Sequence, residues 1–381
     1  MKSTLATFSV LTIAALTLGA CASDPSESGS TASGDLTVAA SDSQCSVSAS
    51  KLEAGPSTFK VTNKGSKVTE FYVYADGDRI MGEVENVGPG LTRNLVVDLP
   101  KGTYEGACKP GMIGDGIRQT LTVSGEAAKS LSDSQELTAA ADSYARYVKS
   151  QSDALIVKTT EFVDAVKAGR VDEAKALFPV ARTYWERIEP VAEKFGDLDP
   201  ITDGREPDAI AEGVDFTGWH RIEKQLWVEN NTKGMDVYAD QLLDNVKQIV
   251  SLGQDAPLTA LELAQGSKGL LDEVATGKIT GEEDEFSHTD LWDFKANVEG
   301  SQAAIAALRP VLEKQDPELV KQLDTQFAAV DTELNQHQDP STGEWQFYDK
   351  LSKDQIKALS DAVAALSEPI SQVAAVVAAS A

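Results

Sequence analysis

The spacing of apolar residues changes once along the chain, near residue 125. Between residues 35 and 125, short runs rich in β-branched and aromatic residues are separated by turn signals such as Asn63-Lys64-Gly65 and Pro89-Gly90. These runs predict strands at 59–61, 69–74, 91–99, 103–108 and 117–123. About ninety residues with this spacing favour an all-β sandwich of antiparallel strands.

From residue 130 to 381 the apolar residues follow a helical period instead. Leu137, Tyr144, Val148 and Leu155 fall on one stripe, and Ile249, Leu258 and Leu261 continue such stripes further along. Ser352 and Gln355 form a capping box that predicts a last helix over 352–379. The chain is longer than one typical domain, so we expect two: a β-sandwich at 35–125 and an all-α helical bundle at 130–381.

The first residues predict export. Lys2 precedes an uncharged, mostly apolar stretch that is too short to span a membrane, and Leu18-Gly19-Ala20-Cys21 follows. These four residues resemble a bacterial lipobox, which predicts a signal peptide at 1–20 and lipid attachment to Cys21; ordinary cleavage after an Ala-x-Ala pattern is the alternative. Residues 21–34, rich in Ser and Gly, read as a flexible tether. We therefore expect a lipid anchor at the outer face of the cytoplasmic membrane.

The net charge of the chain limits the classes of partner that we expect it to bind. Asp and Glu number 60 against 34 Lys and Arg, which gives a formal net charge of -26. A chain this acidic repels nucleic acid and anionic lipid head groups, so neither is an expected partner. The same repulsion disfavours a binder of acidic polysaccharide, which stays open as a third function. The acidic surface either attracts cations or only maintains solubility.

A histidine and a glutamate stand together in the helical part. In Gly218-Trp219-His220-Arg221-Ile222-Glu223, the i, i+3 spacing places His220 and Glu223 on one helix face. The apolar stripe runs through Trp219 and Ile222, so the pair lies at or beside the buried side. A bound cation would compensate such a pair, although a plain ion pair on a helix surface has the same spacing.

Further carboxylates precede this helix. Glu186 and Glu189 repeat the i, i+3 spacing just before Pro190, which we expect to kink or end their helix. Asp203 follows in a proline-containing loop, where it is either a ligand or a turn residue and helix cap.

His288 and Asp290 lie where a later loop enters a helix. Ser287, Thr289 or Asp290 is either part of a site or an N-cap. The acidic loop 282–285 just before them either collects cations or is simply solvated.

Carboxylates with one or two imidazoles suit a hard or borderline cation such as iron, with zinc or copper as competitors. No His-Glu-x-x-His motif is present in the sequence. A zinc-dependent peptidase that uses the His220 to Glu223 helix is the alternative function, but it needs an open coordination position and a base that the sequence does not specify.

The β part holds Cys45, Glu70, Cys108 and Met112 as candidate ligands. Type 1 copper sites use two histidines and a cysteine. Residues 1–219 contain no histidine, so an ordinary blue-copper site is excluded. A disulfide between Cys45 and Cys108 is the alternative to metal ligation, as expected outside the cell.

Three strings together resemble the EfeO family of iron-uptake proteins. They are Tyr-Trp-Glu-Arg-Ile-Glu-Pro-Val-Ala-Glu at 184–193, Gly-Trp-His-Arg-Ile-Glu at 218–223 and His-Thr-Asp-Leu-Trp-Asp-Phe-Lys-Ala-Asn-Val-Glu-Gly at 288–300. The resemblance covers nearly all of the expected mature chain. It implies a cupredoxin-like module followed by an imelysin-type domain, whose peptidase-like signature Gly-x-His-x-x-Glu falls here on Gly218, His220 and Glu223.

The resemblance also implies functional residues and partners. The metal site of the helical domain would be lined by Glu186, Glu189, Asp203, His220 and Glu223, with His288 and Asp290 as further candidates. The β module would bind copper or a second iron through Cys45, Glu70 and Cys108, near Met112. The protein would be a non-catalytic component that captures ferrous or ferric iron and works beside an iron permease and a haem peroxidase.

Overall fold

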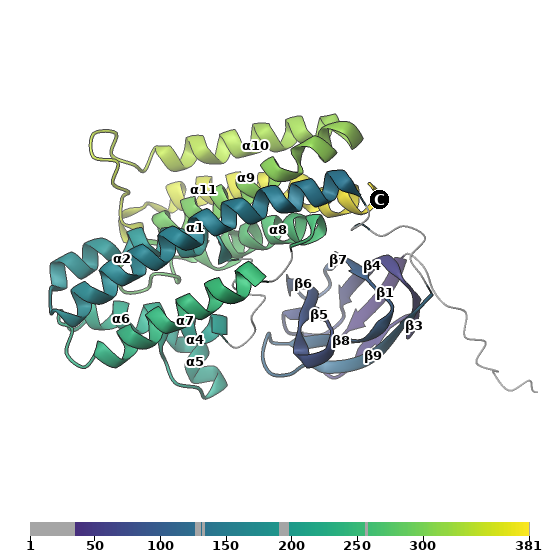
Figure 1. Cartoon of the computed structure of the whole chain (residues 1–381), viewed down its shortest axis with the longest axis horizontal. Helices are drawn as coiled ribbons and strands as arrows, with labels where there is room; N and C mark the ends of the chain where they lie inside the picture. The colour runs from purple at the N-terminus through teal and green to yellow at the C-terminus, as the bar shows by residue number, and fades with distance from the viewer. Residues whose placement is uncertain (1–34, 126–130, 132–133, 190–197, 256–257, 381) are drawn as a thin grey trace, which may run out of the picture. The chain divides into compact units, whose positions relative to one another are not determined.

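The computed structural model describes residues 35–125, 131, 134–189, 198–255 and 258–380 (Figure 1). The predicted signal peptide, Cys21 with its tether, and Pro190 lie outside these residues. Strands occupy the first part of the described chain and helices the rest. The predicted fold class, an all-β module followed by an all-α domain, is confirmed.

The strands form two sheets, with the orders β2-β1-β4-β7 and β3-β9-β8-β5-β6. Their bounds are β1 Asp35–Ala40, β2 Cys45–Val47, β3 Lys51–Glu53, β4 Gly55–Asn63, β5 Thr69–Tyr74, β6 Ile80–Val87, β7 Thr92–Leu99, β8 Gly102–Pro110 and β9 Ile117–Ser124. Every predicted strand is present. The expectation of purely antiparallel pairing is wrong, because β1 pairs with β4, and β3 with β9, in parallel.

The core of the β module lies between the facing sides of the sheets. Phe59 of β4 and Phe71 of β5 are fully buried there, with ring centroids 5.5 Å apart. β4 alternates inward and outward residues, whereas all six residues of β5 are buried. The residues of β5 are apolar at successive positions because both faces of this strand are buried.

The helical domain follows. Its helices are α1 Gln135–Lys167, α2 Val171–Glu186, α4 Leu198–Asp203, α5 Glu206–Glu212, α6 Gly218–Trp227, α7 Asp236–Asp255, α8 Ala260–Thr276, α9 Asp290–Gln315, α10 Pro317–Asn335 and α11 Lys353–Ala378. The predicted stripe of α1 is buried at all four positions. The capping box at Ser352 and Gln355 is present, and α11 ends one residue before the predicted limit.

Long helices pack side by side to make the main core. α9 contacts α1, α8, α10 and α11, and Figure 1 shows α9 among these helices. Within the described part of the chain, α11 alone is long and apolar enough to cross a membrane. Its residues Leu359, Val363, Leu366 and Val373 are buried in the main hydrophobic core of the helical domain.

Shorter elements meet at the C-terminal end of α2. α2 contacts α6 and α9, and α4 contacts α6. The segment between α8 and α9 contains the short helix η4, Lys278–Thr280, followed by the acidic loop. These elements carry the polar residues of the candidate site.

Candidate metal centre

The placement of α6 depends on the glycine of the Gly-x-His-x-x-Glu signature. Gly218 opens the helix at a φ of 75°, and the preceding Thr217 hydroxyl donates to the carbonyl oxygen of Ile201 at 2.6 Å. A Cβ at residue 218 would lie 2.0 Å from the carbonyl oxygen of Thr202. Only glycine permits both this conformation and this close approach of α6 to α4.

α6 buries its ionisable pair as well as its apolar residues. His220 is 2% exposed and Glu223 is fully buried, as are the neighbouring Trp219 and Ile222. The Nδ1 atom of His220 lies 3.0 Å from Glu223 Oε2. The expected pair is therefore present inside the domain and not on a helix surface.

Glu223 also holds the acidic loop in place. Its second oxygen, Oε1, accepts the backbone N–H groups of Phe286 at 3.0 Å and Ser287 at 2.7 Å. This anchoring brings Glu283 and Asp284 over the imidazole: Glu283 Oε1 lies 3.9 Å from His220 Nε2, and Asp284 Oδ1 lies 3.9 Å from Nδ1.

The reading of loop 282–285 as solvated is wrong for its two central residues. Glu283 is 6% exposed and Asp284 is fully buried, while Glu282 and Glu285 are exposed. The backbone bonds to Glu223 supply the physical reason, because they fold the loop inward. Only Glu282 and Glu285, at the two ends of the loop, are therefore exposed to solvent.

Asp203 reaches the site from the end of α4. Its Oδ1 lies 3.3 Å from His220 Nε2, and its Oδ2 accepts the indole N–H of Trp185 at 2.6 Å. It also pairs with the guanidinium of Arg182. Asp203 is thus a member of the cluster, although the sequence left a turn or cap role open.

Arg182 is the central cation of the cluster and was missed at the sequence level. It is fully buried on α2. Its guanidinium contacts the carboxylates of Glu186, Asp203, Glu283, Asp284 and Asp293. No single helix pattern brings these partners together, so only the tertiary fold reveals the role of Arg182.

A second buried cation, Lys278 of η4, holds the predicted pair Glu186 and Glu189. Its Nζ contacts Glu186 and lies 3.2 Å from Glu189 Oε2. Asn297 Nδ2 donates to Glu186 Oε2 at 3.0 Å and to Glu189 Oε2 at 2.9 Å. The two glutamates do share a site, but α2 ends at Glu186 rather than at Pro190.

The last two sequence candidates lie at the edge of the cluster or outside it. Asp290 is buried and its Oδ1 accepts the backbone N–H of Asp284 at 3.3 Å, so it supports the loop. His288 is half-buried at a φ of 59°, and its carbonyl oxygen accepts the N–H of Tyr348. Among the described residues, no group with metal-ligand spacing includes His288 or Asp290.

Four groups of three residues do have that spacing, with one potential ligand atom from each residue within 4.8 Å of the others. Two contain the imidazole: His220, Glu223 and Asp284, and Asp203, His220 and Glu283. The other two are Glu186, Glu283 and Asp293, and Glu186, Glu189 and Asp203. Nearly all donors are oxygen atoms, a set that suits iron and similar cations.

Burial and charge perturb the protonation of the cluster. Burial raises the pKa of Asp284 and Asp293 well above the ordinary aspartate value, and that of Asp290 to about 7. Burial and Arg182 oppose protonation of His220, but the carboxylates of Asp203 and Glu223 raise its pKa well above the ordinary value. Without a metal the cluster therefore retains protons, and a bound cation would displace them.

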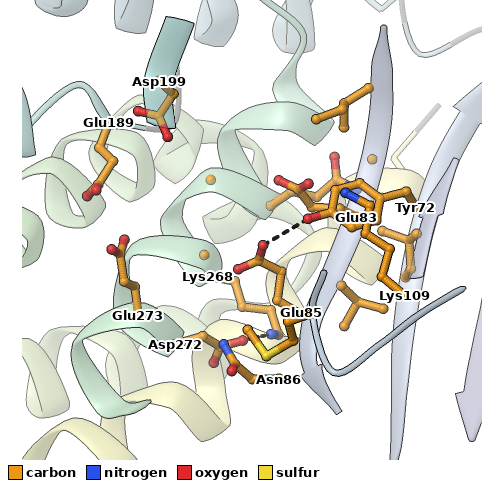
Figure 2. Close-up of a pocket in the computed structure, with 18 of the residues that line it drawn as sticks. Tyr72, Glu83, Glu85, Asn86, Lys109, Glu189, Asp199, Lys268, Asp272 and Glu273 are labelled. Atoms are coloured by element: carbon orange, nitrogen blue, oxygen red, sulfur yellow. Dashed lines mark hydrogen bonds and ion pairs between the residues drawn. The ribbon is translucent and has the colours of Figure 1, made fainter. Parts of the chain in front are cut away.

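The cluster is reachable from a cavity. Glu189, Asp203 and Glu283 of the site line it together with Asp199 and Glu273. Figure 2 shows Glu189, Asp199 and Glu273 with their carboxylates around this space. A hydrated cation approaching through the cavity would therefore first meet acidic side chains.

In the β module the candidate ligands do not form one site. Cys45 and Cys108 form a disulfide, the alternative that the sequence left open. Phe71 pairs with Cys108 and Glu70 with Lys109, so Glu70 points to the opposite face of the sheet from Cys108. Met112 is 37% exposed, in the turn after β8. Glu70 lies on the same face of β5 as Tyr72, whose hydroxyl donates to Glu85 at 3.1 Å.

Known proteins share both parts of this architecture. The imelysin family model, which carries a peptidase classification, matches residues 140–373, and the model of the cupredoxin-like domain matches residues 9–123. The chain is 39% identical over 340 residues to the iron uptake system component EfeO of Escherichia coli O157:H7, which covers 88% of this chain and 89% of that protein. With the same coverage, it is 38% identical to the EfeO proteins of Escherichia coli K12 and Shigella flexneri. The chain therefore belongs to the EfeO family of iron uptake system components, with a cupredoxin-like module followed by an imelysin domain.

Proposed function

We propose that this chain is a lipid-anchored binding protein that captures ferrous or ferric iron outside the cytoplasm and delivers it to a membrane permease. The observation that carries the proposal is the unbalanced charge of the buried cluster. Among the described residues, the cluster and its edge hold two full cations, Arg182 and Lys278, and eight buried or nearly buried carboxylates: Glu186, Glu189, Asp203, Glu223, Glu283, Asp284, Asp290 and Asp293. Buried carboxylates need protons or cations as partners.

The imidazole of His220 marks the position for iron. Glu223 and Asp284 lie on its Nδ1 side, and Asp203 and Glu283 lie on its Nε2 side. One nitrogen donor among several carboxylate oxygens is a ligand set for a hard or borderline cation. Burial raises the pKa of Asp284 and Asp293, so these carboxyls keep their protons when no metal is bound. A bound iron ion would replace those protons.

Calorimetric titration tests the capture step. Fe²⁺ under anaerobic conditions, ferric citrate, Cu²⁺ and Zn²⁺ are added in turn to the full chain. Iron should bind tightly, and replacing both His220 and Glu223 by Ala should abolish that binding while circular dichroism stays unchanged. The matched control replaces His288 and Glu285, a histidine and an acidic residue outside the four ligand groups, and should retain the affinity. Unchanged iron affinity in the His220 and Glu223 variant would sink the proposal.

The second candidate function is a zinc-dependent peptidase, which the classification of the imelysin model favours. It predicts cleavage of a peptide library that depends on zinc and stops on chelation. Among the described residues, His220 is the one imidazole in the ligand groups. Catalytic zinc sites combine histidine-rich ligand sets with a water in an open position, so the oxygen-rich cluster favours binding over hydrolysis.

For the β module we propose a supporting role in delivery. Binding of copper or a second iron at Cys45 and Cys108 requires reduction of their disulfide, because the thiolate is the form of cysteine that ligates metals. Glu70 faces away from that disulfide, so it would not complete such a site without rearrangement.

The lipid anchor at Cys21 would keep the chain beside its permease and a haem peroxidase of the same uptake system. The sequence Leu-Gly-Ala-Cys at 18–21 supports this part of the proposal. Mass spectrometry of the protein extracted from membranes should find an acylated Cys21. In a Cys21→Ser variant the protein should leave the membrane fraction, whereas Ser23→Ala, two residues away, should not release it.

A further inference from the structure

Lys278 lies in surroundings that resemble a metal site. Its ammonium group contacts Glu186 and lies 3.2 Å from Glu189, 3.6 Å from Glu273 and 3.8 Å from Glu283. Lys278 is fully buried. Four glutamate carboxylates lie at 3.8 Å or less from the ammonium group and compensate its buried charge.

The carboxylates around Lys278 could hold a cation in its place. Oxygens of Glu186, Glu189 and Asp203 lie within 4.8 Å of one another, as do oxygens of Glu186, Glu283 and Asp293. Asp293 is fully buried, and its Oδ1 has no hydrogen-bond partner among the described residues. A buried carboxylate oxygen without a partner next to two further carboxylates indicates a position for a cation.

Lys278 differs from Arg182 in how it is held. Arg182 belongs to the 16-residue helix α2, and its rigid guanidinium contacts five carboxylates. Lys278 belongs to a three-residue turn between Gly277 and Gly281, and its ammonium is a single point charge on a flexible stem. Glu189, Glu273 and Glu283 also line the cavity, so this second position is reachable by an ion.

We propose that Lys278 restricts the cluster to one metal ion: its ammonium fills a second cation position beside Glu186, the residue that both of these ligand groups share, and removing the lysine opens that position to a divalent cation. The first ion is the one at His220, so this inference rests on the proposed function. The ammonium group of Lys278 is then an internal cation that occupies the position of a second metal ion.

The stoichiometry of Mn²⁺ binding tests this inference. Equilibrium dialysis of the full chain followed by elemental analysis should give one ion per chain for the unchanged protein and two for Lys278→Ala. Lys278→Arg, which keeps the charge, should bind one. Lys268→Ala is the matched control, because Lys268 also pairs with a carboxylate, that of Asp272, but lies outside the cluster; it should bind one.

The outcomes separate the two proposals. No ion in the unchanged protein, with none in any variant, would contradict both the proposed function and the second position. An equal number of ions in Lys278→Ala and the unchanged protein would overturn the role of Lys278 alone. If Lys278→Ala is unfolded without metal, Mn²⁺ should restore its circular dichroism; a variant that Mn²⁺ does not restore also overturns it.

Discussion

The Cβ position of Gly218 lies 2.0 Å from the carbonyl oxygen of Thr202. This contact joins the first residue of α6 to α4, two residues ahead of His220 and next to Asp203 in sequence. The glycine of the family signature therefore serves the packing that brings His220 and Asp203 together. It does not itself supply a ligand.

Gly218→Ala should destabilise the helical domain strongly. The positive φ alone costs about 1–2 kcal/mol, and the clash with backbone atoms adds to it, for a total of several kcal/mol. Gly213→Ala is the control, because Gly213 has a φ of 72° but open space at the Cβ position. Thermal unfolding should show a small decrease in the free energy of unfolding for Gly213→Ala and a much larger decrease for Gly218→Ala. Equal losses would mean that the contact with Thr202 contributes little.

Arg182→Met should also lower the stability of the helical domain strongly. The change removes the partner of five buried or nearly buried carboxylates, and breaking a buried ion pair typically costs about 3–5 kcal/mol. Divalent cations should recover part of this loss. Arg309→Met is the matched control, because Arg309 pairs with Asp324 on the surface and should change stability by less than about 1 kcal/mol. Urea unfolding measures both, and equal effects would contradict a structural role for Arg182.

Removal of the disulfide should affect only the β module. Cys45 and Cys108 are 63 residues apart in the sequence, and closing a loop of that size contributes about 4 kcal/mol in the chain-entropy model. The double change to Ala should lower the unfolding temperature of the β module and leave iron binding by the helical domain unchanged. Loss of iron binding in that variant would show that the cysteines belong to the functional site.

Glu70 makes the stability of the β module depend on pH. Burial and the charge of Glu85 raise its pKa from 4.5 to about 8. The folded state therefore binds a proton that the unfolded state releases, so stability is lost as pH rises from about 4.5 to 8. Glu70→Gln should remove roughly 1–3 kcal/mol of this loss between pH 5 and pH 8. Glu53→Gln on the exposed edge of β3 should keep the slope of the unchanged protein, and an unaltered slope in Glu70→Gln would contradict the assignment.

The sequence predicted the parts of the site that depend on local periodicity. The i, i+3 spacing of His220 and Glu223 and the apolar stripe around them placed both residues correctly on the buried side of α6. Glu186 and Glu189 were recognised by the same spacing. Strands β4, β5, β7, β8 and β9 were likewise predicted, whereas β1, the short β2 and β3 and the charged β6 were not.

The missing parts depend on tertiary contacts. Arg182 and Lys278 look like ordinary surface cations in the sequence, and only the convergence of α2, η4 and α9 buries them among carboxylates. Glu283 and Asp284 belong to a loop whose composition indicates solvation, but the backbone bonds to Glu223 turn them inward. Glu70 and Cys108 are close in the sheet, yet strand pairing sends their side chains to opposite faces.

Anomalous diffraction at the iron absorption edge, from crystals of the full chain soaked with Fe²⁺, tests the central claim most directly. The account predicts one strong peak within bonding distance of an imidazole nitrogen of His220 and of carboxylate oxygens among Asp203, Glu223, Glu283 and Asp284. The peak should vanish when His220 and Glu223 are both replaced by Ala. A peak elsewhere with no density at His220, or an unchanged peak in that variant, would contradict the account.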